Sequence, residues 1–190
     1  MYQAETECQD THHDNCDFQN GLCKWKNSQT EIGSWIVTFN EENGPRYIEK
    51  ATSGVFLYSL KSCVSVDHTY GTNYGKYIQA EGDGQNGDEF GSAVLESQTL
   101  EQVHSEGDCL QFWYYLHEKN SSDGTNILVN MYQEGSDERI ELKKLSGDHG
   151  EVWRLDRTPV KSDKKYKVGD CQNIIALSLS FELCLAPNSR

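Results

Sequence analysis

Cysteine and histidine are the residues whose spacing in this sequence most readily suggests chemistry. Near the start of the chain, Cys8, His12, His13 and Cys16 form a C-x3-H-H-x2-C pattern. Thiolate and imidazole groups are both ligands that Zn²⁺ accepts. Adjacent histidines point in different directions, however, and the spacing matches no standard closed zinc site. We therefore interpret the segment as a solvated N-terminal extension, with Cys16 belonging to the structural unit that follows.

Two further segments imitate a catalytic motif and a calcium-binding motif. Asp67-His68-Thr69 places a carboxylate beside an imidazole, but no serine or cysteine lies in a recognisable nucleophile elbow. A turn in which the aspartate and threonine side chains bond the backbone is the simpler interpretation. The run 81–89 is acidic and rich in glycine, but the twelfth residue from its first aspartate is Val94, where an EF-hand needs glutamate. The sequence predicts a surface hairpin at 81–89 and no catalytic residue.

The seven cysteines are spread along the chain and form no C-x-x-C pair. Such a spread is typical of structural disulfides in a secreted protein. Because seven is odd, at least one sulfur stays free or pairs outside this chain. Cys16 and Cys23 have six residues between them, including the turn-forming Asn20-Gly21, so a disulfide can close this small loop. The seven are Cys8, Cys16, Cys23, Cys63, Cys109, Cys171 and Cys184.

The chain is acidic, with 30 Asp and Glu against 17 Lys and Arg in 190 residues and a formal net charge of −13. Nucleic acid and anionic membrane surfaces are poor partners, because the overall field repels phosphate groups. No run approaches 18 apolar residues, so no segment is expected to insert into a membrane. The first residues have neither the basic nor the apolar region of a signal peptide. Composition alone leaves the compartment open.

Alternation of apolar and polar residues predicts strands along the whole chain. The strongest examples are 175–185 and 110–116, each with its apolar side chains on one parity. Weaker alternation predicts strands at 35–39, 55–57, 93–95, 127–131 and 140–142. Asn-Gly and Asp-Gly turn signals separate them, and no window shows helical periodicity. This pattern predicts one all-β domain, an antiparallel β-sandwich, with a barrel as the geometric alternative.

An ordered set of motifs resembles the MAM domain, the extracellular adhesion module of meprins, neuropilins and receptor tyrosine phosphatases. The matching pieces are Cys16-Asp17-Phe18-Gln19-Asn20-Gly21-Leu22-Cys23-Lys24-Trp25, Trp35, Asp67-His68-Thr69, Gly75-Lys76-Tyr77-Ile78, Gly91-Ser92-Ala93-Val94-Leu95-Glu96-Ser97, Cys109-Leu110-Gln111-Phe112-Trp113-Tyr114-Tyr115, Gly150-Glu151-Val152-Trp153 and Ile175-Ala176-Leu177. The resemblance implies a jelly-roll β-sandwich over 16–185. Residues 1–15 are polar and lack alternation, so we interpret them as a tail, and 186–190 as the start of a linker. The chain departs from the pattern by an insertion at 46–66, by Gln19 in place of glutamate, and by the missing acidic pair after Leu177.

The resemblance also implies how the cysteines pair. It implies a Cys16–Cys23 disulfide and a second one between Cys109 and Cys184, for which Cys171 is the rival partner. The resemblance does not extend to Cys63, which lies in the insertion; our own expectation is that it pairs with Cys171.

Other site residues follow from the resemblance or from short motifs. Jelly rolls of this kind can hold a structural cation, and oxygen ligands suit calcium, so Asp17 and Asp67 are candidate calcium ligands. The missing acidic pair and Gln19 remove further candidates, and no other cofactor is expected. Asn120-Ser121-Ser122 is an N-glycosylation acceptor in a polar segment.

We therefore expect an extracellular, non-catalytic module of a larger secreted or membrane-anchored protein. It would bind proteins, including other copies of itself, through an exposed sheet face or loops that present Tyr70, Tyr74 and Tyr77. The alternative is a carbohydrate-binding jelly roll attached to a secreted enzyme, with Trp113 as the outward-facing aromatic residue. The tryptophans at 25, 35 and 153 are expected to pack in the core or on a sheet face.

Overall fold

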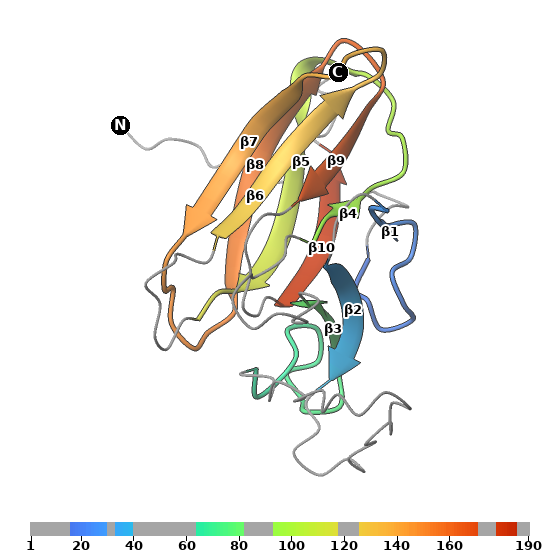
Figure 1. Ribbon diagram of the computed structural model, residues 1–190. Helices are drawn as coiled ribbons and strands as arrows, with labels where there is room; N and C mark the ends of the chain where they lie inside the picture. Colours follow the sequence, from blue (N-terminus) through green and yellow to red (C-terminus); the bar gives the residue numbers. More distant parts are fainter. Residues whose placement is uncertain are drawn as a thin grey trace, which may run out of the picture.

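The described residues form two five-stranded sheets, whose strands are labelled in Figure 1. The computed structural model describes residues 16–29, 33–39, 64–81, 93–117, 126–170 and 178–185. Within these ranges the paired strands all run antiparallel, and no helix is found. The described part of the chain therefore holds no helix of the length and hydrophobicity needed to cross a membrane.

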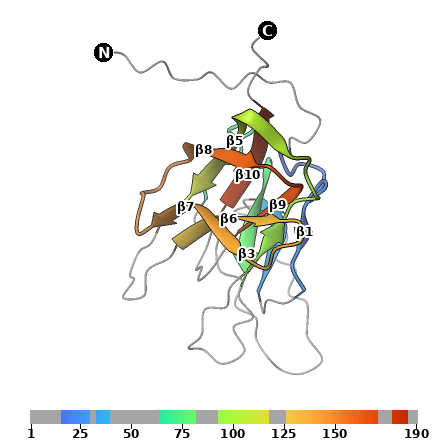
Figure 2. The same cartoon turned by 90° about the horizontal axis from the view of Figure 1, so that it is seen from above.

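The first sheet has the order β2-β3-β10-β5-β8 and the second has the order β1-β4-β9-β6-β7. In the first, the bounds are β2 (Ser34–Phe39), β3 (Lys76–Glu81), β10 (Ser178–Leu185), β5 (Val103–Tyr115) and β8 (Arg154–Ser162). In the second, they are β1 (Lys26–Asn27), β4 (Leu95–Glu96), β9 (Tyr166–Asp170), β6 (Asn126–Gln133) and β7 (Arg139–Ser146). The view from above shows β8, β5 and β10 in one layer and β7, β6 and β9 in the other (Figure 2). The predicted all-β sandwich is confirmed.

The core lies between the two sheets and is built by the predicted alternation. Leu110 and Phe112 of β5 are fully buried, as are Ile127 and Val129 of β6. Each such side chain contributes about 1.5–3 kcal/mol on leaving water. Trp35 of β2, 1% exposed, also belongs to this core. The two sheets are therefore held together by hydrophobic packing between the apolar faces of their strands.

Alternation fails to predict β3, β9 and β8, of which β8 is the longest. Its inward side chains include Asp156, Thr158 and Ser162, so the inner face is largely polar. These groups are satisfied by the opposite sheet. Lys143 Nζ lies 3.0 Å from Asp156 Oδ2, and Gln133 Nε2 donates to Ser162 Oγ at 3.1 Å. Polar pairs thus close this edge of the sandwich where apolar residues would have been expected.

Several predictions lie outside the described residues. They concern the tail and its zinc-like pattern, the strand at 55–57, the hairpin near 82–89 and the insertion through residue 63. The glycosylation acceptor Asn120, the linker start, and the residues Cys8, Cys63 and Cys171 also lie outside. The domain bounds themselves stay a prediction. Of the strand expected at 175–185, residues 178–185 form β10. Of that at 93–95, only Leu95 lies in a strand, whereas Ala93 forms an isolated bridge with Gly33.

The register between β10 and β5 yields a test of the second disulfide. It sets the Cα atom of Cys184 opposite that of Cys109. Directly opposed residues in antiparallel strands have Cα atoms about 4.5–5.5 Å apart, a spacing that a disulfide can bridge. We expect a non-reducing digest of the purified protein to contain a peptide that joins Cys109 to Cys184. A peptide joining Cys109 to Cys171 would contradict the pairing.

Candidate binding surface

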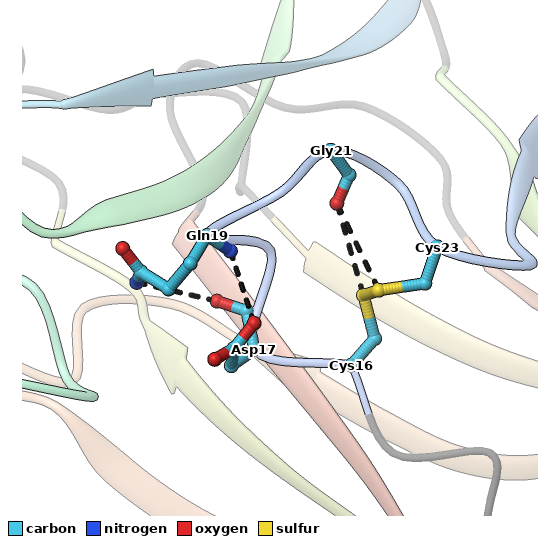
Figure 3. The surroundings of a disulfide bond; sticks show 5 residues. All are labelled: Cys16, Asp17, Gln19, Gly21 and Cys23. Atoms are coloured by element: carbon cyan, nitrogen blue, oxygen red, sulfur yellow. Dashed lines mark hydrogen bonds between the residues drawn. A yellow bond between two sulfur atoms is a disulfide. The ribbon is translucent and has the colours of Figure 1, made fainter.

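The Cys16–Cys23 disulfide is present, as predicted, and closes a loop at the start of the described chain (Figure 3). The Gly21 carbonyl oxygen lies 3.8 Å from Cys16 Sγ and 3.9 Å from Cys23 Sγ. Phe18 has φ 58°, in the left-handed region, and its side chain is fully buried in the core. Non-glycine residues rarely adopt that conformation, which costs about 1–3 kcal/mol. The closed loop and the burial of the ring together hold Phe18 there.

Gln19 connects this loop to the first residue of β3. Its Nε2 atom donates to the Lys76 carbonyl at 2.9 Å, and the Lys76 N–H donates to Gln19 Oε1 at 3.0 Å. The side-chain amide therefore bonds Lys76 as a neighbouring strand would. A carboxylate at position 19 could accept from Lys76 but could not donate to its carbonyl group. Asp17 is exposed, and its Oδ1 atom accepts the Gln19 N–H at 3.1 Å (Figure 3).

Asp67 organises the loop that precedes β3, which confirms the predicted turn. Its carboxylate is 1% exposed and accepts hydrogen bonds from Tyr70 N at 2.7 Å and Thr72 N at 2.9 Å. The Thr72 hydroxyl donates to the same carboxylate at 3.3 Å. The hydroxyl oxygen also accepts the Gly75 N–H at 3.1 Å. The role expected of Thr69 thus belongs to Thr72.

Gly75 is required by the position of this carboxylate. A Cβ atom on Gly75 would overlap the carboxyl group of Asp67. The backbone of the loop therefore passes so close to the buried acid that any side chain at position 75 would displace it. This contact gives a physical reason for the Asp67-His68-Thr69 and Gly75-Lys76-Tyr77 segments to occur together.

The two candidate calcium ligands, Asp17 and Asp67, both make local hydrogen bonds. Both carboxylate oxygens of Asp67 bond the backbone of its own loop. Among the described residues, no group of three or more His, Cys, Asp or Glu side chains is arranged to hold a metal ion. Calcium binding at this pair stays a prediction.

Aromatic rings gather where the Asp67 loop meets the outer face of the first sheet. The imidazole of His68 stacks on Trp113, with 3.8 Å between ring centroids. Trp153 makes T-shaped contacts with Tyr77 and Tyr115, at centroid distances of 6.1 and 5.8 Å. Trp113 therefore faces away from the core, as predicted. Trp25 and Trp35 pack in the core, and Trp153 packs on the outer sheet face.

Burial against these rings lowers the pKa of His68, and the nearby Asp67 carboxylate opposes this effect only in part. The neutral imidazole is therefore favoured, and it packs on Trp113 as an uncharged ring.

The loop between β7 and β8 places Trp153 in this cluster. Trp153 Nε1 donates to the Val66 carbonyl at 2.8 Å, which ties the loop to the chain before Asp67. His149 anchors the same loop, because its N–H donates to the Leu116 carbonyl at 2.8 Å and its Nδ1 lies 2.7 Å from the Tyr114 hydroxyl. Burial raises the pKa of Tyr114, and the Asp156 carboxylate contributes to that shift.

Every large, strongly exposed hydrophobic residue of the described chain lies in these two loops or at the start of β8. We call this set the apolar face. It consists of Val66, Tyr70, Tyr74, Val152 and Leu155. Tyr70 is 63% exposed and Tyr74 is 78% exposed, as expected of interface residues. The same expectation for Tyr77 is wrong, because Tyr77 is 1% exposed beneath Trp153. Both loops lie at the lower end of the molecule in Figure 1.

This β-sandwich fold is also found in a class of modules of known structure. The K1 cleaved adhesin domain of Lys-gingipain from Porphyromonas gingivalis W83 is 16% identical, with a TM-score of 0.58 over 90% of this chain and 96% of that chain. The C-terminal family 22 carbohydrate-binding module of Clostridium thermocellum Xyn10B is 9% identical, with a TM-score of 0.52 over 94% of this chain and 96% of that one. At such identities the likeness concerns the jelly-roll fold alone.

The sequence assigns the chain to one family within that class. The model of the MAM domain, meprin/A5/mu, matches residues 16–169. The chain therefore belongs to the MAM family, whose domains are extracellular modules of the adhesion type.

The Asp67 loop yields a stability prediction. Asp67→Asn places an amide NH₂ or a weaker acceptor opposite the Tyr70 and Thr72 N–H groups, and Gly75→Ala inserts a methyl group into the carboxylate. We expect each substitution to lower the free energy of unfolding by about 1–3 kcal/mol, as measured by urea denaturation. Asn73→Ala, in the same loop, is the matched control and should change it by less than about 0.5 kcal/mol. An Asp67→Asn effect no larger than the control would contradict the assigned role.

Proposed function

We propose that this chain is a non-catalytic recognition module that mediates protein–protein adhesion contacts, including contacts between its own copies. It acts outside the cell, as part of a larger secreted or membrane-anchored protein. Membership in the MAM family and the Cys16–Cys23 disulfide support this compartment.

The observation that carries the proposal is the gathering of exposed hydrophobic residues into the apolar face. Protein interfaces have apolar centres enriched in aromatic residues, and tyrosine is frequent among the residues that dominate binding energy. Tyr70 and Tyr74 stand on a loop that the buried Asp67 carboxylate keeps in shape. A pre-shaped loop loses less conformational entropy on binding than a free one would. The face thus combines exposed aromatic area with a fixed backbone.

Contacts between identical copies must overcome charge. Each copy carries a formal net charge of −13, so two copies repel one another until salt screens them. The attraction must therefore come from short-range burial at the apolar face. Self-association by this route strengthens as ionic strength rises.

The test compares two variants of the purified protein. We expect Tyr70→Ser/Tyr74→Ser to weaken binding by about tenfold or more, because it removes the two most exposed aromatic residues of the face. Self-association is measured by sedimentation velocity at low and high salt, and partner binding by staining of cells with the labelled tetramerised module. Lys161→Ser, on the exposed side of β8, is the control and should leave both unchanged. Unaltered binding by the double tyrosine variant, with an intact melting transition, would reject the proposal.

The second candidate is a carbohydrate-binding module attached to a secreted enzyme. Trp113 favours it, because this ring lies on the outer sheet face two residues along β5 from Gln111. Gln111 Oε1 accepts a 2.6 Å hydrogen bond from Arg157 Nε. A carbohydrate-binding module is also among the structures of the same fold. His68, however, already stacks on Trp113 where a sugar would lie. For this reason we rank protein recognition first.

Glycan binding has a test of its own. If Trp113 stacks on a sugar, His68→Ala should strengthen saturable binding on a soluble glycan array and Trp113→Ala should abolish it. The absence of saturable binding by the unaltered module and by His68→Ala would exclude this candidate.

A further inference from the structure

The two sulfurs of the Cys16–Cys23 disulfide differ in access to solvent. Cys16 is 1% exposed and belongs to the core, whereas Cys23 is exposed. A thiolate must reach a sulfur along the line of the S–S bond to open it, so the accessible sulfur is the one that is attacked. An external thiol therefore meets this disulfide at Cys23.

The loop that the disulfide closes holds conformations that side chains disfavour. Phe18 has φ 58° and Cys23 has φ 53°, both in the left-handed region. Once the bond opens, Cys23 is free to return to an ordinary backbone conformation. The loop around Gln19 then loses its closure.

Opening of the Cys16–Cys23 bond affects the apolar face because hydrogen bonds connect the disulfide loop to the loop that carries Tyr70. Gln19 bonds both backbone groups of Lys76, which follows Gly75. Gly75 packs against the Asp67 carboxylate, and that carboxylate shapes the loop that carries Tyr70. These contacts thus connect Gln19, in the loop that the disulfide closes, with the loop that carries Tyr70.

We propose that Cys23 Sγ is a site of thiol–disulfide exchange, at which a dithiol opens the Cys16–Cys23 bond and loosens the loop that carries Tyr70 and Tyr74. The reacting partner is a reductant with two neighbouring thiols, such as an oxidoreductase with a C-x-x-C site. The effect on recognition rests on the proposed function, but the exchange and the loosening do not.

The exchange takes two displacements. A thiolate of the dithiol attacks Cys23 Sγ, a mixed disulfide forms, and Cys16 leaves as a thiolate that takes up a proton. The second thiolate of the reductant then attacks its own sulfur in the mixed disulfide and releases Cys23 as a thiolate. Two electrons pass to the protein, and the dithiol becomes a disulfide.

The experiment titrates the native, full chain with dithiothreitol and follows two readouts. Differential alkylation with mass spectrometry reports which cysteines are reduced, and amide hydrogen exchange reports the opening of residues 66–77. We expect Cys16 and Cys23 to be alkylated before the other disulfide cysteines, while the sandwich stays folded. Exchange in 66–77 should then rise by about tenfold, with the strands β6 and β7 unchanged.

Two variants that retain the disulfide test the connection through Gln19. Gln19→Ala should show fast exchange in 66–77 without reductant and no further rise with it, whereas Asn20→Ala, in the same loop, should behave as the unaltered chain. Slow exchange in 66–77 after complete reduction of Cys16 and Cys23 would overturn the proposal, as would reduction only on global unfolding. Neither result depends on partner binding, so failure of the proposed function would leave this test intact.

Discussion

A carboxylate buried without solvent must be surrounded by hydrogen-bond donors, and Asp67 meets that requirement by folding its own chain around it. Tyr70 and Thr72 supply the backbone N–H groups. Gly75 leaves the space that the oxygens occupy. The adjacent His68 is thereby set on Trp113. The position of the candidate binding surface therefore depends on one charge that has to be satisfied inside the protein.

The sandwich beneath this surface divides its tryptophans between two environments. Trp25 and Trp35 pack between the sheets, where area buried contributes to stability. Trp113 and Trp153 lie on the opposite side of the first sheet, where loops cover them only in part. Trp153 belongs to the loop between β7 and β8, and it contacts both Val66 and His68 of the Asp67 loop. Both loops of the apolar face therefore pack on the same group of aromatic rings. Two segments distant in sequence therefore act as a single surface.

Much of the fold could be predicted from the period-two pattern. In β5 and β6 the apolar parity is the one that faces the core, because both strands lie inside their sheets. Gln111 and Tyr115, on the other parity of β5, are buried as well. Strand β8 is an edge strand, where inward polar side chains can bond the opposite sheet and proline is tolerated, so its pattern carried no clear signal. The turn at Asp67 and the disulfide at Cys16 were predictable because each depends on neighbouring residues. Burial of Tyr77 beneath Trp153 depends on residues 76 positions apart, and nothing in the local sequence distinguishes Tyr77 from Tyr74.

Pro159 in β8 has a consequence for how copies of this chain can approach one another. It sits on an outermost strand between Arg157 and Lys161, and a ring that lacks an amide hydrogen flanked by two cations is a poor template for a foreign strand. Pairing of another chain with β8 as an added strand is therefore disfavoured, and fibres do not grow from this edge of the sheet. Copies of this chain can therefore lie close together without joining through β8.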